Sequence, residues 1–309
     1  MTAYQQPSVA LGPAGAPEWI AAAIEAGGGV IAPLEDASAL VWTDPRDATG
    51  LAGVLQGRND IDWVQLPWAG VEHFADYGLF DDGRVWTCGK GVYAEEVAEH
   101  ALGLALAGLR RLPDRVRATS WAPPSGLSLL GQKVVVLGGG GITEALLRLL
   151  GPFGVDATVV RRQPTPVRGA TSTVGADRLH DVLPGAAVVF LALALTPETT
   201  GVISADELSL LGSNTWLVNV ARGAHVVTDD LVAALRAGAI GGAALDVTDP
   251  EPLPEGHPLW SLPNVIITPH CANTPDMARG PLAARITANV QRYGRGEPLM
   301  GGVDPQAGY

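Results

Sequence analysis

Residues 133–162 constrain the fold of this chain more than any other stretch. They read KVVVLGGGGITEALLRLLGPFGVDATVVRR: a β-branched run, a cluster of glycines, a helical segment and a second β-branched run. The apolar side chains of the middle segment recur at helical spacing, at Ala145, Leu146, Leu149 and Leu150. This order predicts a strand, a tight turn, a helix and a second strand, the β-α-β unit that binds dinucleotides at its first turn.

The glycines fit the dinucleotide fingerprint as Gly138-x-Gly140-x-x-Thr143, with threonine where a third glycine or an alanine is usual. A small third residue lets the helix pack closely on the strand, so Thr143 predicts a displaced helix or a small neighbour that compensates. We expect the turn, at Gly138, Gly140, Gly141 and Ile142, to bind a pyrophosphate. A glycine-rich loop is often only a turn, and the flanking strand and helix favour the cofactor site here.

Two arginines end the second strand of this unit. Folds that bind NAD usually carry an acidic residue about 20 residues after the glycines, where it binds the ribose 2′-hydroxyl. Arg161 and Arg162 occupy that place, and the nearby acid Asp156 opens the strand at its other end. Because guanidinium groups bind phosphate oxygens in pairs, the sequence favours a 2′-phosphate, and therefore NADPH over NADH. The alternative is that both arginines form a solvated strand end.

Length and composition limit what the rest of the chain can be. At 309 residues, with 47% hydrophobic and 17% charged residues, it is long enough for two domains of a globular enzyme. The longest apolar run, residues 186–195, is about half of the ~20 residues that a membrane-spanning helix needs. Residues 1–45 contain no Lys or Arg, so we expect no secretory signal and a cytoplasmic location. A net charge of −12 argues against a nucleic-acid partner.

The first third of the chain alternates between helix and strand patterns. Its first fifteen residues are rich in Pro, Gly and Gln, and we expect them to be loosely attached. The pattern then predicts a small, mostly parallel sheet, with helices at 18–26 and 51–56 and strands at 29–32, 39–43 and 63–66. Beyond the last strand, backbone amides of Ala69, Gly70 and Val71 could face a substrate carboxylate. From these residues alone, an ordinary strand-to-helix turn is favoured.

A strand at 85–87 and a long apolar helix at 94–110 follow. The helix is a plausible connector and subunit contact, and we expect His100 within it to be a packed structural histidine. The segments RLPDR and WAPPSG are expected to form a linker into the glycine unit.

The second sheet continues after the arginine pair, with strands predicted at 186–195, 216–220, 243–247 and 265–268. Between the second and third of these, Thr228 is expected to cap a helix that Gly238 ends. A last amphipathic helix, about 276–293, is expected to return to the first domain.

Three reactive side chains each follow a different strand of this sheet. Arg222, Glu251 and His270 lie after carboxyl ends of parallel strands, where such folds bind ligands. Imidazole titrates near neutrality, so His270 suits proton donation to a new alkoxide, and a carboxylate such as Glu251 would keep it charged. Arg222 would bind a substrate carboxylate as a fork and polarise the carbonyl. The alternative is a surface ion pair between Arg222 and Glu251, and a structural histidine at 270.

The other histidines and the cysteines show no reactive pattern. His257 is expected in a Pro-bounded turn, and loop or rim positions are expected for His73, His180 and His225. Cys88 and Cys271 form neither a metal-binding spacing nor a disulfide framework, so we expect no bound metal.

With these residues in view, the chain resembles the D-isomer-specific 2-hydroxyacid dehydrogenase family. The resemblance is strongest from Val97 to Thr274, and its motifs are VAEHALGLALAGLRRLP, VVVLGGGGI, LTPETTGVI, LVNVARG, ALDVTDPEPLP and ITPH. It implies two Rossmann- or flavodoxin-like α/β domains with doubly wound parallel sheets. A dinucleotide domain at 96–273 would be inserted into a substrate domain made of 1–95 and 274–309. The resemblance also implies a homodimer and a cleft that closes on the substrate.

The resemblance implies a role for each site residue. Arg222 would bind the 2-oxo acid, Glu251 would pair with His270, and His270 would be the acid-base. The substrate carboxylate would lie at Ala69, Gly70 and Val71, and Asp246 would hold the nicotinamide carboxamide. The full cofactor-binding set expected is Gly138, Gly140, Gly141, Ile142, Arg161, Arg162, Thr196, Ala221 and Asp246.

Together these observations predict an oxidoreductase that reduces a small 2-oxo acid, such as glyoxylate or hydroxypyruvate, to the D-2-hydroxy acid with NADPH. The arginine pair resembles the NADPH-preferring reductase branch of the family, and it argues against NAD-dependent oxidation of a small anion on the same scaffold. A non-catalytic, cofactor-sensing regulatory protein is the alternative from another class. The complete set of Arg222, Glu251 and His270 argues against it, because a sensor needs no proton donor.

Overall fold

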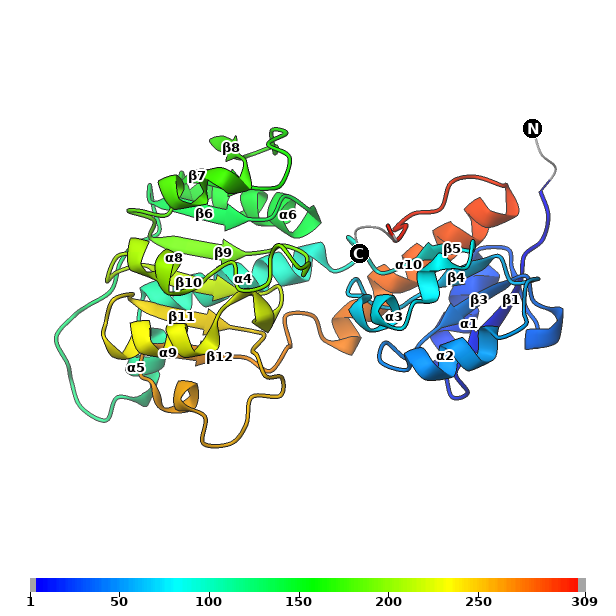
Figure 1. The fold of residues 1–309 in the computed structure, drawn as a ribbon, viewed down its shortest axis with the longest axis horizontal. Coiled ribbons are helices and arrows are strands. Elements are labelled where there is room, and N and C mark those ends of the chain that lie inside the picture. The colour runs from blue at the N-terminus through cyan, green and yellow to red at the C-terminus, as the bar shows by residue number, and fades with distance from the viewer. Residues whose placement is uncertain (1–3, 305–309) are drawn as a thin grey trace. The chain divides into compact units, whose positions relative to one another are not determined.

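The computed structural model describes residues 4–304, which divide into two compact units, each built on one parallel sheet (Figure 1). The central unit contains residues 94–273. The split unit contains the described residues on either side of it, 4–93 and 274–304. The expected α/β class with parallel sheets is confirmed.

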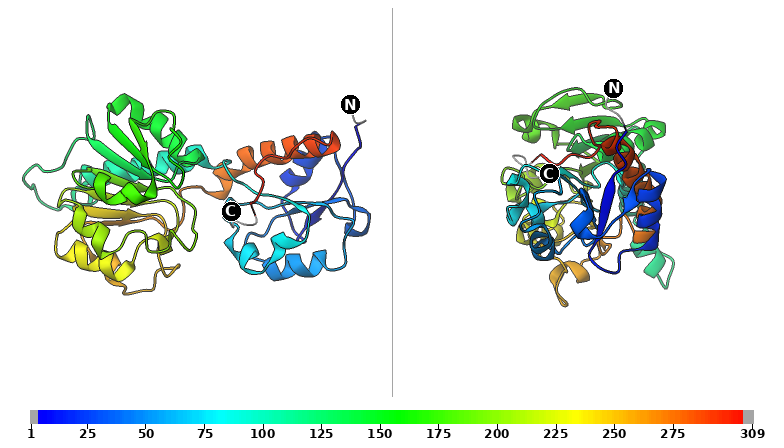
Figure 2. Two further views of the ribbon diagram at one scale, coloured as in Figure 1. Left: turned by 45° about the horizontal axis from the view of Figure 1, so that its top comes forward. Right: turned by 90° about the vertical axis from the view of Figure 1, so that its right-hand side faces the viewer.

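The sheet of the split unit has the strand order β2-β1-β3-β4-β5, which is the flavodoxin-like arrangement. Its strands are β1 (Ser8–Gly12), β2 (Val30–Ile31), β3 (Ala39–Trp42), β4 (Trp63–Gln65) and β5 (Val85–Thr87). Its helices are α1 (Glu18–Ala26), α2 (Ala48–Leu55), α3 (Glu72–Asp76) and α10 (Pro275–Gly294). The last helix, orange in Figure 2, packs against α1, where the hydroxyl of Thr287 donates to the carbonyl of Ala23 at 2.9 Å.

The expectation that the first fifteen residues are loosely attached is wrong. Residues 1–3 lie outside the described part, but Ser8–Gly12 form β1, which pairs with both β2 and β3. Val9 has no exposed surface. Pro7 and Pro13 mark turns on either side of this strand, and the apolar residues between them suffice for a short strand that is buried on both faces.

The sheet of the central unit has the order β12-β11-β10-β9-β6-β7-β8. Read from β8, this is the 3-2-1-4-5-6 order of a dinucleotide-binding fold with a seventh strand added. The strands are β6 (Lys133–Leu137), β7 (Asp156–Val160), β8 (Ser172–Val174), β9 (Val188–Leu191), β10 (Trp216–Asn219), β11 (Gly242–Leu245) and β12 (Val265–Ile267). The order reverses between β6 and β9, which is the point where such sheets bind their ligands.

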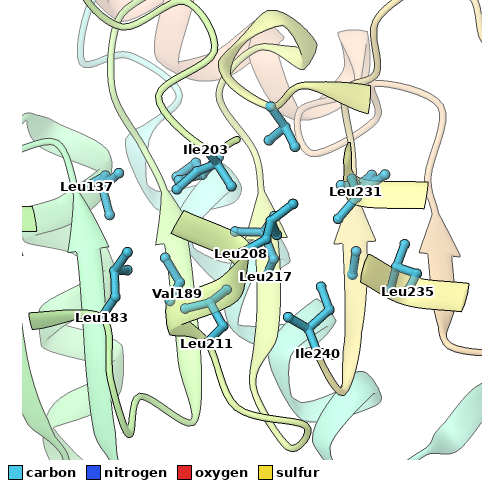
Figure 3. Close-up of a cluster of buried hydrophobic side chains, with 14 of the residues drawn as sticks. Leu137, Leu183, Val189, Ile203, Leu208, Leu211, Leu217, Leu231, Leu235 and Ile240 are labelled. Atoms are coloured by element: carbon cyan, nitrogen blue, oxygen red, sulfur yellow. The ribbon is translucent and has the colours of Figure 1, made fainter. Parts of the chain in front are cut away.

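Helices cover both faces of this sheet. They are α4 (Ala94–Leu109), α5 (Leu112–Arg117), α6 (Gly141–Leu150), α7 (Leu179–Val182), α8 (Ala205–Leu210) and α9 (Thr228–Arg236). α4 packs against α6, and α8 packs against α9. Figure 3 shows part of the core on this face, a cluster to which α8 contributes Leu208, α9 contributes Leu231, and the sheet contributes Val189 and Leu217. This packing holds the strands rigidly, and with them the loops at their carboxyl ends.

Three local expectations need correction. Most of RLPDR belongs to α5 rather than to a linker. Arg111 immediately precedes the helix and pairs with Asp114 in its first turn at 2.9 Å. The edge strand β8 was not expected, since three residues are too few to show a periodic pattern. Thr228 does not cap α9: it is the first residue of the helix, and its hydroxyl donates to the carbonyl of Asp249 at 2.7 Å.

No helix among residues 4–304 combines the length and apolar character needed to cross a membrane.

The buried position of β1 predicts that Val9→Asn lowers the free energy of unfolding by about 3 kcal/mol, because it places an amide in an apolar core. Val30→Asn is a matched control on the neighbouring strand β2, where the side chain is 41% exposed, and we expect a change within about 0.5 kcal/mol. Urea unfolding followed by circular dichroism measures both. Equal effects of the two substitutions would show that β1 does not contribute to the core.

Candidate functional site

The carboxyl edge of the central sheet carries most of the expected site residues. The glycine turn follows β6, the arginine pair follows β7, and Thr196 lies in the loop after β9. Ala221 and Arg222 follow β10, Asp246 and Glu251 follow β11, and His270 follows β12. Because all these strands are parallel, the residues share one edge of one sheet.

The backbone of the glycine turn passes close to the backbone of the loop after β9. Gly138 has φ 109°, and a Cβ there would lie 2.2 Å from the carbonyl oxygen of Ala192, so only glycine fits. Gly140 immediately precedes α6, and a Cβ at this residue would meet no atom within 4 Å. The amides that open α6, from Gly141 onward, therefore border open space that a pyrophosphate can enter.

Thr143 is accommodated without a polar penalty. Its side chain is fully buried in α6, and its hydroxyl donates to the carbonyl of Gly138 at 2.9 Å. The threonine thus ties the first turn of the helix to the turn before it, and the buried hydroxyl has its partner.

The first arginine of the pair lies directly against the glycine turn. A Cβ at Gly139 would lie 2.9 Å from Cδ and Nε of Arg161, so the arginine side chain lies directly over this glycine. Arg162 is exposed. A hydrogen bond from Thr196 and, to a smaller extent, the charge of Arg162 lower the pKa of Glu198 in the loop after β9. Both arginines are therefore near the loops that the dinucleotide fold uses, and Asp156 opens β7 at the opposite end.

A buried histidine orders the turn that carries Arg222. His225 has no exposed surface, so the expectation of a loop or rim position is wrong. Its Nδ1 accepts from the amide of Arg222 at 3.2 Å, which leaves Nε2 to donate to the carbonyl of Ala194 at 3.2 Å. Asn219 at the end of β10 adds a second support, since its Nδ2 donates to the carbonyl of Arg222 at 2.8 Å. The sequence offered no sign of the contact between His225 and Ala194, because it joins two loops that are 31 residues apart in the chain.

His270 and Glu251 form a pair. Nδ1 of His270 lies 2.8 Å from Oε1 of Glu251, and the side chains are 45% and 37% exposed. The carboxylate places the hydrogen of the neutral ring at Nδ1, so exchange of a proton falls to Nε2. His270 also has φ 50°, a left-handed conformation that is uncommon outside glycine and clusters at functional sites.

The backbone of His270 is held by Asp246, whose carbonyl accepts from its amide at 2.8 Å. The side chain of Asp246 is 2% exposed and accepts from the hydroxyl of Thr268 at 2.6 Å and from the amides of Cys271 and Ala272 at 2.9 and 3.0 Å. Burial opposes the charged form, but these donors, together with His100, lower the pKa of Asp246 to about 2.

His100 completes this network from α4. Its Nε2 lies 2.9 Å from the hydroxyl oxygen of Thr268 and 3.3 Å from Oδ1 of Asp246. Because Thr268 donates its hydrogen to Asp246, the histidine donates to Thr268. Neither Thr268 nor His100 was expected near the site, and only the fold brings α4 to the end of β12.

The remaining expected residues lie in the split unit. Ala69, Gly70 and Val71 form the turn between β4 and α3, and Val71 is buried. The amide of Gly89 donates to the carbonyl of Trp68 at 2.9 Å, which fixes the start of this turn.

A cavity lies at the other edge of the central sheet. It has a volume of about 750 Å³ and is lined by residues that precede strands, among them Asn214, Gly241 and Asn264. Ligands of open α/β sheets bind at the carboxyl edge, so we do not assign this cavity to the cofactor.

The network around Asp246 predicts that Thr268→Val lowers the free energy of unfolding at pH 7 by about 1–3 kcal/mol, since a buried carboxylate loses a donor. Thr268→Ser keeps the hydroxyl and should stay close to wild type. The low pKa stabilises the fold above the unfolded-state pKa near 4, and this contribution is lost as the pH falls toward 2. The difference in the free energy of unfolding between wild type and Thr268→Val, measured by urea unfolding, should therefore become smaller below pH 4. If this difference does not depend on pH, Thr268 does not donate to a charged Asp246.

Comparison with known proteins agrees with this geometry. Residues 101–272 match the family described as "D-isomer specific 2-hydroxyacid dehydrogenase, NAD binding domain". The chain is 30% identical over 282 residues to "Glyoxylate/hydroxypyruvate reductase A" of Yersinia enterocolitica, a similarity that covers 88% of this chain and 87% of that protein.

Solved structures show the same relationship over nearly the whole chain. A D-isomer specific 2-hydroxyacid dehydrogenase from Xanthobacter autotrophicus Py2, in complex with NADPH and MES, has a TM-score of 0.84 and 29% identity, with 99% of this chain and 100% of that chain covered. An NADPH-dependent glyoxylate/hydroxypyruvate reductase from Sinorhizobium meliloti, in complex with NADP and sulfate, has a TM-score of 0.82 and 25% identity, with 98% and 100% covered. The chain therefore belongs to the D-isomer specific 2-hydroxyacid dehydrogenase family and is an NAD(P)-dependent oxidoreductase.

Proposed function

We propose that this protein reduces a small 2-oxo acid, of the glyoxylate or hydroxypyruvate type, to the D-2-hydroxy acid with NADPH. The observation that carries the proposal is the pair of His270 and Glu251 at the same sheet edge as the glycine turn. The relatives named as glyoxylate/hydroxypyruvate reductases support the substrate class.

In this mechanism the bound nicotinamide supplies the hydride. His270 donates a proton from Nε2 to the carbonyl oxygen as it becomes an alkoxide. Glu251 accepts from Nδ1 and holds the ring in this orientation. Arg222, on a turn that His225 and Asn219 fix, binds the substrate carboxylate and polarises the carbonyl. In the split unit, the amides of Ala69, Gly70 and Val71 are proposed as the substrate-binding groups.

The residues present fit a dinucleotide. The open space beside Gly140 admits a pyrophosphate, and Ile142, Thr196 and Ala221 lie in the loops around it. Asp246 would accept from the nicotinamide carboxamide. We propose a preference for NADPH because Arg161 lies against the glycine turn and the acid Asp156 opens β7 at its far end. Relatives solved with NADPH or NADP support this preference.

We also propose that the central unit binds the cofactor and the split unit binds the substrate, with domains at 96–273 and at 1–95 plus 274–309. A homodimer stays a proposal, supported by exposed apolar side chains between α4 and β6. Among them Val116 of α5 is 84% exposed, and Trp121 in the segment after α5 is fully exposed. Figure 1 shows a long loop after α5. A cytoplasmic location also stays a proposal.

The role of His270 predicts that His270→Gln lowers kcat for glyoxylate with NADPH by about 10²–10⁴-fold, while the Kd for NADPH changes little. Glu251→Gln should cause a smaller loss, because the ring remains but loses the carboxylate that orients it. His180→Gln is the matched control: this histidine is exposed and also pairs with a glutamate, Glu207, at 2.6 Å, away from the sheet edge. Loss of NADPH absorbance measures turnover. Near wild-type turnover in folded His270→Gln would refute the acid-base role.

The cofactor assignment predicts that Arg161→Glu combined with Arg162→Glu lowers the ratio of kcat/KM with NADPH to kcat/KM with NADH by about 10²-fold or more, since charged hydrogen bonds to a phosphate are lost. Arg236→Glu reverses an exposed charge at the end of α9, beside the cavity at the opposite edge, and should leave the ratio unchanged. If the double variant keeps the wild-type ratio, the arginines do not select the cofactor.

A further inference from the structure

His100, Asp246 and Cys271 bring a nitrogen, a carboxylate oxygen and a sulfur together from three different elements of the central unit. These ligand atoms all lie within 4.8 Å of one another. We propose that the three side chains form a Zn²⁺-binding site, and that the bound ion withdraws Asp246 from the cofactor. The first part stands on geometry alone, and the second rests on the proposed function, in which Asp246 accepts from the nicotinamide carboxamide.

The spacing of the ligand atoms suits a tetrahedral ion. With Zn–N and Zn–O bonds of about 2.0–2.2 Å and Zn–S bonds of about 2.3 Å, neighbouring ligand atoms are about 3.3–3.6 Å apart. Nε2 of His100 lies 3.3 Å from Oδ1 of Asp246, so one edge of the tetrahedron is already formed. The sulfur closes the third corner by a small side-chain adjustment. Water takes the fourth position, because the side chain of His100 is 25% exposed and Cys271 is partly exposed.

The charge and chemistry of the cluster favour zinc over magnesium. One carboxylate and one thiolate neutralise a divalent ion. The partly buried site then carries no net charge, which lowers the desolvation free energy of binding. Sulfur and imidazole are the ligands that Zn²⁺ prefers, whereas Mg²⁺ demands oxygen ligands in octahedral geometry.

Binding releases one proton. Zinc binds cysteine as the thiolate, so the hydrogen of the Cys271 thiol leaves when the ion binds. The Zn–S bond replaces the S–H bond, and the proton passes to solvent. His100 moves its ring hydrogen from Nε2 to Nδ1 through solvent, with no net change in protons, and no electron is transferred.

The ion would bind the Asp246 carboxylate that the proposed function assigns to the nicotinamide carboxamide. Hydrogen bonds from Thr268 and from two backbone amides fix the orientation of the Asp246 carboxylate. It therefore cannot rotate to bind Zn²⁺ and the nicotinamide carboxamide at the same time. Zn²⁺ and NADPH should therefore exclude each other.

Cobalt titration of the metal-free, full-length protein tests the site, because Co²⁺ replaces Zn²⁺ and reports its ligands by absorbance. We expect one Co²⁺ per chain, with a thiolate-to-cobalt charge-transfer band and the intense visible bands of tetrahedral cobalt. Zn²⁺ should abolish these bands, and Mg²⁺ should not. Cys271→Ser should remove the charge-transfer band and weaken binding about tenfold or more, and His100→Gln should weaken it similarly. Circular dichroism confirms that each variant is folded.

His270→Gln is the matched control, because His270 and Glu251 offer a neighbouring nitrogen–carboxylate pair that could bind the ion without Cys271. It should keep the charge-transfer band. Absence of the band in the wild type, or its persistence in Cys271→Ser, would overturn the site. Saturating NADPH should prevent the band from forming in the wild-type protein. If Co²⁺ binds with its thiolate band and NADPH binds beside it, the exclusion is wrong and the metal site stands. If NADPH does not bind at all, the proposed function fails while the cobalt result still decides the site.

Discussion

The ionised carboxylate of Asp246 is the contact on which the reactive edge of the central sheet depends. It is almost fully buried, and it persists as an anion because its side chain accepts three hydrogen bonds from the loop after β12. His100 of α4 lies 3.3 Å from the same carboxylate. A buried carboxylate without such donors would take up a proton or disrupt the fold. The hydrogen bonds stabilise the charge on Asp246, and the charged carboxylate in turn holds the loop after β12 in place.

This arrangement also positions His270. The carbonyl of Asp246 accepts from the amide of His270, and the side chain of Asp246 accepts from the two amides that follow. Three consecutive amides thus bind one residue, which accounts for the left-handed backbone at position 270. The conformation costs on the order of 1–3 kcal/mol and persists because the contacts around it determine it.

Three histidines of the central unit differ in role because their hydrogen-bond partners and their burial differ. His225 is buried and neutral, and it orders the Arg222 turn through both ring nitrogens. His270 is half-exposed beside a carboxylate, which suits proton exchange. His100 donates to a threonine that itself donates to Asp246, so it stabilises the anion from a second layer. Residue type is the same in all three, and only the surroundings differ.

The sequence by itself determined the fold class, the glycine turn, the arginine pair and the strands that carry Arg222, Glu251 and His270. These features rest on local patterns: runs of β-branched residues, glycines at a turn and apolar residues at helical spacing, all visible over a few neighbouring residues. The tertiary structure alone decided that β1 is an inner strand, that His225 is buried and that His100, Thr268 and Cys271 meet at Asp246. These depend on contacts between segments up to about 170 residues apart in the chain. Such contacts leave no periodic trace in the sequence, because they form only when the parallel sheet brings separate loops to one edge.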